Sequence, residues 1–298
     1  MLYNNLSTYL KNKYGKKIGK ICIDGGFTCP NRDGKCGTGG CIYCGERGAG
    51  EHINGAADIK AQVAAGLKNP KYAGFIAYFQ SFTNTYAGVE ELKEKYDSAL
   101  ADEKIVALAI GTRPDCIDDE IAALIASYKD RVDVWVELGL QTASDTVAEI
   151  IGRGYKTEVF VRAAEILNRY GIPFVVHMII GLPGESEGDP KATARLINES
   201  GAFGIKIHSI YVMNGTRLAD LYKQNLYTPP TLESYVNTAV GVLEILRPDI
   251  TVHRLTGDCP RGMLLAPDWN ADKNAIIKRI TDELSVRGTR QGSLYGKD

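Results

Sequence analysis

Short apolar runs rich in β-branched residues alternate along this chain with segments whose apolar residues recur at helical spacing. Runs of this kind are typical of buried strands, and their alternation with helices predicts right-handed βαβ units around a parallel sheet. The predicted strands are residues 18–23, 75–79, 105–110, 134–140, 174–180 and 205–212. The predicted helices are residues 59–67, 89–100, 118–128, 157–170, 190–200 and 235–246. Six such units predict an α/β fold, a partial (β/α)6 barrel similar to a TIM barrel.

Signals at the ends of these segments support the assignment. Thr157 is a candidate N-cap for the helix that it begins, and Gly171 followed by Pro173 ends that helix. The last part of the chain, residues 250–298, predicts one more strand (TVHRL), a loop and a basic terminal helix. We therefore expect one domain, with a barrel over residues 1–249 and a C-terminal strand and helix extension that closes the barrel mouth.

Polar residues interrupt two of the predicted strands. In VWVELGLQ, Trp135, Glu137, Gly139 and Gln141 share one face, and in IKIHSIYV the same holds for Lys206 and His208. Both faces of a strand in a parallel barrel are covered, so these polar residues should point into the barrel. They lie toward the carboxyl ends of their strands, where barrel enzymes carry their chemistry. A buried carboxylate at 137 needs a cationic partner, for which Arg113 and Lys206 are candidates.

Composition places the chain among ordinary globular proteins. Of its 298 residues 44% are hydrophobic and 24% are charged, and the net charge is −1. No run approaches the roughly 18 apolar residues of a membrane span, and the first residues lack the pattern of a signal peptide. We expect a cytoplasmic protein with no membrane partner. Two basic clusters are either solvated faces or contacts for phosphates; they comprise Lys11, Lys13, Lys16, Lys17 and Lys20, and Lys278, Arg279, Arg287, Arg290 and Lys297.

The clearest chemical signal is a cysteine-rich loop that follows the first predicted strand. Five of the seven cysteines fall between positions 22 and 44, and the segment GFTCPNRDGKCGTGGCIYC places four of them in one glycine-rich loop. A local cluster of this kind indicates metal or iron–sulfur ligation rather than disulfides. A structural zinc site on four thiolates usually uses two short knuckles, and only Cys41 and Cys44 form one. An iron–sulfur cluster also requires converging thiolates, so both kinds of site remain possible from the residues alone. A set of inert buried thiols does not suit the polar neighbours.

This loop, closing in Cys-x-aromatic-Cys after the first barrel strand, resembles the radical S-adenosylmethionine (SAM) superfamily. The string GFTCPNRDG…GGCIYC resembles a narrower bacterial group related to the Elongator catalytic subunit and to oxygen-independent coproporphyrinogen oxidase; GTRPD and VELGLQ resemble the Elongator subunit too. The resemblance implies that Cys29, Cys41 and Cys44 hold a [4Fe–4S] cluster, with Cys36 as an additional thiol. It also implies that the cluster binds SAM and cleaves it reductively to a 5′-deoxyadenosyl radical.

The same resemblance implies a set of SAM-binding residues. Tyr43 occupies the position whose backbone meets adenine. The string YFQSFTNTY takes the place of the motif that holds the SAM amino group, although it lacks the Gly-Gly-Glu form. The implied cofactor-binding residues are Tyr43, Gln80, Ser81, Thr83, Glu137, Gln141, Arg153 and His177.

Substrate contacts are less defined by the pattern. Polar residues near the barrel mouth are the catalytic candidates: Lys206, His208, Cys259, Asp258 and Lys273. Cys259 is either a hydrogen donor or a bystander thiol. Together with Arg254 and Trp269, the C-terminal candidates form a polar group that either contacts substrate or only caps the barrel.

The resemblance further implies an activity and partners. For this group it suggests a tRNA-modifying enzyme that converts the wobble-uridine side chain from carboxymethylaminomethyl toward aminomethyl, with reduced flavodoxin or ferredoxin as electron donor. Two other hypotheses remain: a radical SAM enzyme that acts on a small metabolite, and a non-catalytic zinc or iron–sulfur binding module.

Overall fold

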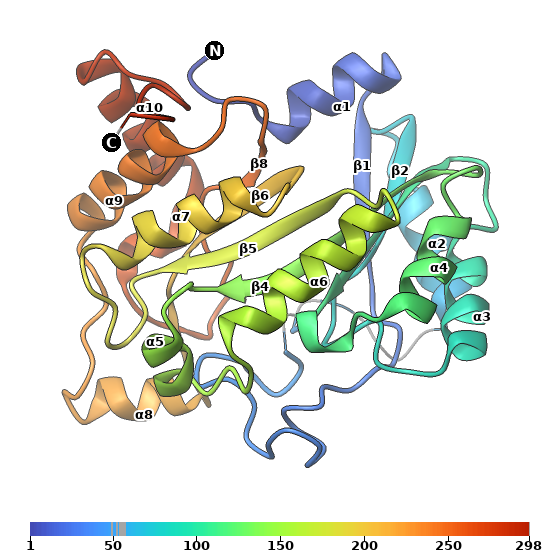
Figure 1. The fold of residues 1–298 in the computed structure, drawn as a ribbon, viewed down its shortest axis with the longest axis horizontal. Coiled ribbons are helices and arrows are strands. Elements are labelled where there is room, and N and C mark those ends of the chain that lie inside the picture. Colours follow the sequence, from blue (N-terminus) through green and yellow to red (C-terminus); the bar gives the residue numbers. More distant parts are fainter. Residues whose placement is uncertain (49, 52, 54–57, 298) are drawn as a thin grey trace.

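One curved parallel sheet organises the chain, which the computed structural model describes at residues 1–48, 50–51, 53 and 58–297. Seven strands pair in the order β1-β2-β3-β4-β5-β6-β8 (Figure 1). They are β1 (Ile18–Ile23), β2 (Gly74–Phe79), β3 (Ile105–Thr112), β4 (Asp133–Gln141), β5 (Phe174–Ile180), β6 (Gly204–Ser209) and β8 (Thr251–Arg254). Strand order follows chain order, and β1 and β8 are the two edges. The predicted partial barrel is confirmed, with β8 of the C-terminal extension as a seventh strand.

Helices between consecutive strands cover the outer face of this sheet (Figure 1). The helices are α1 (Leu6–Tyr14), α2 (Ile59–Leu67), α3 (Val89–Ala99), α4 (Asp119–Ser127), α5 (Asp145–Ile150), α6 (Thr157–Arg169), α7 (Asp189–Glu199), α8 (Arg217–Lys223), α9 (Leu232–Ile245) and α10 (Lys273–Val286). The predicted strand over 205–212 divides into β6 and β7 (Val212–Met213), which pairs antiparallel with β9 (Leu264–Ala266). In the described part of the chain, no helix combines the length and apolarity that crossing a bilayer requires.

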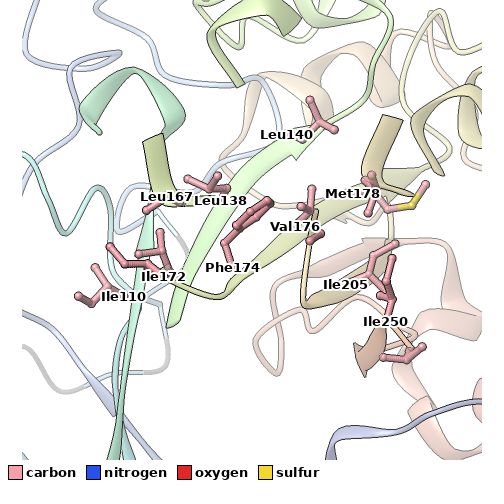
Figure 2. Packing of buried hydrophobic residues seen from close by; sticks show 14 of the residues in the cluster. Ile110, Leu138, Leu140, Leu167, Ile172, Phe174, Val176, Met178, Ile205 and Ile250 are labelled. Atoms are coloured by element: carbon pink, nitrogen blue, oxygen red, sulfur yellow. The ribbon is translucent and has the colours of Figure 1, made fainter. Parts of the chain in front are cut away.

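The main core lies between the outer face of the sheet and seven of these helices, α2, α3, α4, α6, α7, α9 and α10. Leu138 of β4, Val176 of β5 and Ile205 of β6 pack there, and Leu167 of α6 packs onto them (Figure 2). Strand residues alternate between two faces, so the outward position of Leu138 turns its neighbours Glu137 and Gly139 into the barrel. The core pattern therefore aims the polar residues of β4 at the inner face.

The start of α6 differs from the predicted capping. The N-cap residue is Lys156, and Thr157 is the first helical residue. The Thr157 hydroxyl donates to the carbonyl of Ala143 at 3.1 Å, while the Thr157 N–H donates to Asp145 at 2.7 Å. Thr157 thus joins the helix to the loop after β4 instead of capping it. At the other end Gly171 adopts a positive φ of 60°, as expected for a helix stop.

The N-terminal segment connects the two edges of the sheet at the amino ends of the strands. The N–H of Val252 in β8 donates to the carbonyl of Asn4 at 2.7 Å, and Asn5 bridges Val252 in parallel. Leu10 of α1 packs into the barrel interior. Because α1 leads into the start of β1, it lies opposite the carboxyl ends of the strands.

Candidate functional site

A cavity of about 240 Å³ opens at the carboxyl ends of the strands, beneath the loop that follows β1. Its walls come from that loop and from the ends of β2 to β6. Eleven residues with a predicted site role line it: Cys29, Cys41, Tyr43, Cys44, Gln80, Thr83, Glu137, Gln141, Arg153, His177 and His208. The position agrees with the rule that parallel α/β folds place their sites at the carboxyl ends of strands.

Three thiols share this cavity, and a fourth lies outside it. Cys29, Cys41 and Cys44 line the wall, whereas Cys36 is exposed and its thiol lies 3.8 Å from Asp115 Oδ2. Among the described residues, no three cysteine, histidine or acidic side chains meet closely enough to hold a single metal ion. An iron–sulfur cluster presents a separate iron to each thiolate, so three cysteine thiols on the wall of one cavity are a donor set that fits it.

The surroundings of Cys41 favour its thiolate. The thiol of Cys44 bonds it, the Asn31 amide nitrogen lies 3.8 Å from its sulfur, and the Arg113 guanidinium is nearby. These contacts outweigh burial and lower the pKa of Cys41 to about 6. The same hydrogen bond raises the pKa of Cys44, so the site favours a thiolate, the form that binds iron, at Cys41 and not at both cysteines.

Backbone hydrogen bonds hold the cysteine loop against the turn at residues 151–154. The N–H of Ile42 donates to the carbonyl of Ile151 at 3.0 Å, and the Asn31 side chain donates to Gly152 at 2.7 Å. Arg32 donates to the carbonyls of Cys44 and Gly45 at 3.3 and 2.6 Å. The segments that carry the predicted ligands Cys29, Cys41 and Cys44 are therefore held by contacts that do not depend on a bound cluster.

Arg153 lies in this turn and is 1% exposed. All five of its N–H groups are bonded inside the chain. Two of them reach the carbonyls of Leu140 and Thr142 at 2.7 and 2.6 Å, on either side of Gln141. No donor is left for a cofactor carboxylate, so Arg153 fixes the end of β4 and acts on the cavity through Gln141.

Replacing Arg153 by methionine should lower the free energy of unfolding by about 3 kcal/mol, because the buried carbonyls of Leu140 and Thr142 and the partly buried carbonyl of Tyr155 each lose a donor. In a chain of this size that corresponds to a fall of about 6 °C in the melting temperature of the reconstituted protein. Arg162→Met is the matched control, since Arg162 is exposed and paired with Glu158 alone. A similar small change in both variants would contradict the structural role.

Gln141 itself has an unusual backbone conformation, with φ 68°. The pairing of β4 with β5 is irregular at this point, between Gly139 and Gln141. Phe82, which also lines the cavity, has φ 57°. Left-handed conformations of this kind cost free energy in residues other than glycine and concentrate at functional sites. Both strained residues of the cavity wall thus mark it as functional.

The floor of the cavity is a buried ionic network centred on Glu137. This carboxylate bonds the Lys206 ammonium and lies 2.8 Å from His177 Nε2, and the Trp135 indole donates to it at 3.3 Å. Lys206 also donates to the Tyr78 hydroxyl at 3.1 Å. Of the two predicted cationic partners for Glu137, Lys206 is therefore the one found. Arg113 instead bonds Asp115 at 2.7 and 2.9 Å and the carbonyl of Arg153 at 2.9 Å.

Burial and neighbouring charges shift the pKa values in this network. The cations around Glu137 hold its pKa well below the usual range despite burial. Burial lowers the pKa of Lys206 to about 7 and that of His177 to about 4. At neutral pH His177 is neutral, and because ionised Glu137 only accepts hydrogen bonds, His177 Nε2 carries the proton. Its Nδ1 is then an acceptor.

Stability should fall between pH 7.5 and 5.5 because the unfolded chain protonates His177 near pH 6.5, while the folded chain does so only near pH 4. The difference is about 1 kcal/mol over this range. His177→Gln removes it, so melting curves at the two pH values should show a smaller loss for the variant than for the native chain. An equal loss in the two proteins would mean that His177 titrates normally in the fold.

Other candidates lie outside the cavity lining. Ser81 is fully buried behind the wall, with an Oγ that has no hydrogen-bond partner among the described residues. Lys206 lies below the floor. Asp258 forms an ion pair with Lys273 and lies 3.7 Å from Arg254, and Cys259 follows Asp258 on the same loop. The catalytic roles of Lys206, His208, Cys259, Asp258 and Lys273 stay predictions, and of these residues His208 alone lines the cavity.

Among the wall and support residues that the structure adds are four without a predicted role in cofactor binding or catalysis. Phe82, Tyr155 and Arg113 line the cavity, and Asn31 bonds the loop. Asn31 lies two residues after Cys29, the first predicted ligand, and Arg113 directly follows β3. Both could have been found from the sequence by these positions, next to a predicted ligand and at the end of a predicted strand. Tyr155, whose ring lies 4.8 Å from Arg113 and 4.6 Å from Arg153, lies in a loop with no periodic pattern.

Comparison with known proteins identifies two families along the chain. The profile described as the radical SAM superfamily matches residues 32–197, and the profile described as the radical SAM C-terminal domain matches residues 202–285. YtqA of Bacillus subtilis (strain 168) is 36% identical over 301 residues, which cover 98% of this chain and 92% of that protein.

Two further relatives carry more specific names. A tRNA uridine(34) acetyltransferase of Dehalococcoides mccartyi (strain CBDB1) is 30% identical over 193 residues, or 63% of this chain and 41% of that protein. The structure of Methanocaldococcus infernus Elp3 with an N-terminal deletion has a TM-score of 0.69 at 17% identity. The match covers 92% of this chain and 64% of that one, and it shows a shared fold.

Proposed function

The chain belongs to the radical SAM superfamily of enzymes, and from this premise we propose that the cavity described above holds both cofactors of the superfamily, a [4Fe–4S] cluster and SAM. The observation that carries the proposal is that three cysteine thiols and the polar strand ends line one cavity. When bound, the reduced cluster supplies the electron that cleaves SAM into methionine and a 5′-deoxyadenosyl radical. The side chains of the protein bind and orient the two cofactors.

We assign the cluster irons to Cys29, Cys41 and Cys44. The loop contacts made by Asn31 and Arg32 keep these ligands in place before the cluster arrives. Cys36 stays outside the ligand set because its thiol faces Asp115 rather than the cavity.

SAM then lies against the strand ends. Gln80 and Thr83 follow β2 and line the cavity, and we assign them to the SAM amino group in preference to Ser81, which does not line it. Tyr43 of the cysteine loop also lines the cavity and packs against the hydrophobic cluster that contains Ile179 and Ile210. Gln141 at the end of β4 and His177 of β5 line it as well. Glu137 orients His177 so that its free Nδ1 accepts from a hydroxyl group such as those of ribose.

For the substrate we propose a tRNA whose wobble uridine carries a carboxymethylaminomethyl group, converted toward aminomethyl. The support is the relationship to proteins named tRNA uridine(34) acetyltransferases. The basic clusters add little: α1 lies at the opposite end of the barrel, and in α10 Lys278 and Arg287 pair with Asp282 and Glu283 at 2.6 and 2.7 Å. We further propose reduced flavodoxin or ferredoxin as electron donor and a cytoplasmic location, where all seven free thiols would stay reduced.

The test is anaerobic reconstitution, followed by assay of 5′-deoxyadenosine with SAM, dithionite and either modified or unmodified tRNA. We expect 5′-deoxyadenosine, faster formation with tRNA that bears the carboxymethylaminomethyl group, and nucleosides with the aminomethyl group after digestion. Formation of 5′-deoxyadenosine that no tRNA accelerates would overturn the tRNA assignment and favour a small metabolite. A protein that takes up zinc but no cluster would overturn the cofactor assignment.

A further inference from the structure

Cations from both edges of the sheet gather on the inner face of the barrel, next to the cavity floor. Lys20 of edge strand β1 places its ammonium 4.5 Å from the centre of the Tyr78 ring. Lys206 of β6 lies equally close to that ring and donates to its hydroxyl. Arg254 of edge strand β8 is the register partner of Lys206. Tyr78 and Glu137 line the cavity, so these cations lie beside the space where the cofactor and substrate meet.

Negative charge at this place does not balance the positive charge. Glu137 is bonded to Lys206, and Asp258 is shared between Arg254 and Lys273. Lys20 forms no ion pair among the described residues. The cations therefore outnumber the carboxylates, and of these four cations Lys20 is the one without a carboxylate partner among the described residues. Consistent with this excess, Lys20 and Arg254 both add to the lowering of the pKa of Lys206.

The two cations at the edges are also accessible. Lys20 is exposed and the Arg254 side chain is 35% exposed, whereas Lys206 is buried. An exposed lysine and a partly exposed guanidinium on the two edge strands of an open barrel form the kind of donor pair that binds carboxylate or phosphate oxygens. The contact of Arg254 with a carboxylate of the chain is weak, because Asp258 lies 3.7 Å from Arg254 and is already bonded to Lys273.

We propose that Lys20 and Arg254 form an anion site that binds the carboxylate of the substrate side chain at the open edge of the barrel. The inference rests on the proposed function, and it adds the chemical feature by which the substrate is recognised. A side chain ending in a carboxylate is held at its far end by these cations, which places its inner carbons over the cavity floor. A product that has lost the carboxylate loses this contact and is released.

The test compares two nucleosides on the reconstituted chain with SAM bound, by equilibrium dialysis. The probes are 5-carboxymethylaminomethyluridine and 5-aminomethyluridine. The second lacks the carboxymethyl group and therefore the carboxylate. We expect the first to bind more tightly, and Lys20→Gln or Arg254→Gln to weaken its binding about tenfold, as loss of a charge-assisted hydrogen bond predicts. Binding of 5-aminomethyluridine should not change. Lys17→Gln is the matched control, because Lys17 also lies over a tyrosine ring, that of Tyr72 at 5.6 Å, but precedes β1.

Each alternative gives a different result. Equal weakening for both nucleosides, or no weakening, would overturn the carboxylate site. Weaker SAM binding in the variants would assign the anion to the SAM carboxylate instead, and uridine 5′-monophosphate bound through Lys20 and Arg254 would assign it to a phosphate. Failure of the proposed function is visible separately, because the native chain in the same preparation would then form no 5′-deoxyadenosine, or would form it at a rate that no tRNA increases.

Discussion

Cys41→Ala should abolish cluster binding and reduce 5′-deoxyadenosine formation by roughly 100-fold or more, since the change removes a thiolate from a three-cysteine set. The site lowers the pKa of the Cys41 thiol, chiefly through its hydrogen bond with Cys44, and the Asn31 amide nitrogen lies 3.8 Å from its sulfur. The measurement is iron and sulfide content, the optical spectrum after anaerobic reconstitution, and the rate of 5′-deoxyadenosine formation. Cys29→Ala and Cys44→Ala should behave in the same way.

Cys36→Ala is the matched control for this series. It removes a thiol from the same glycine-rich loop, but one that is exposed and faces Asp115. The variant should keep its iron content and its rate of SAM cleavage. Loss of the cluster in Cys36→Ala would contradict the three-ligand assignment and return the loop to a four-thiolate site.

Lys206→Met should lower the free energy of unfolding by about 3 kcal/mol or more, because it leaves the Glu137 carboxylate buried without its closest cation. Glu137 is 1% exposed and Lys206 is 3% exposed, so water does not replace the lost contact. The melting temperature of the reconstituted protein is the measurement. Lys278→Met, which breaks an exposed pair with Asp282, should change stability by less than about 0.5 kcal/mol.

A double variant separates the charge from the packing. In Glu137→Gln with Lys206→Met the buried charge is gone, and the amide still bonds His177. This protein should regain most of the stability lost in Lys206→Met, since replacing both partners of a buried pair costs far less than replacing one. If the double variant is as unstable as the single one, the contacts of the Lys206 ammonium with Tyr78 matter more than the ion pair.

Most of the barrel was predictable because each strand buries one continuous apolar face. The runs at 18–23 and 174–180 match β1 and β5 to the residue, and the other strands agree within a few positions. The short helices α1, α5 and α8 were not predicted. They have only nine, six and seven residues, and helices this short depend on tertiary contacts for their stability. Their caps were visible nevertheless, for example Asn5 before α1 and Ser144 before α5.

The site was predictable where residues touch the cavity directly and less so where they act through others. The inward face of β4 followed from alternation, which placed Glu137 and Gln141 correctly on the barrel side. Arg153 was predicted as a cofactor-binding residue, and all five of its donors bond backbone and side-chain acceptors of the chain. These acceptors lie at the end of β4, in the loop after it and around the start of α6, and no local pattern reports how these segments meet.

The N-terminal segment that connects the sheet edges also protects the protein from self-association. An open barrel leaves β1 and β8 with unpaired backbone groups, and such edges are templates for strand pairing between molecules. Asn4 and Asn5 occupy part of the β8 edge, through the bond from Val252 and the bridge beside it. Removing the first residues would expose that edge, and the shortened chain should then form aggregates at concentrations at which the intact chain remains monodisperse.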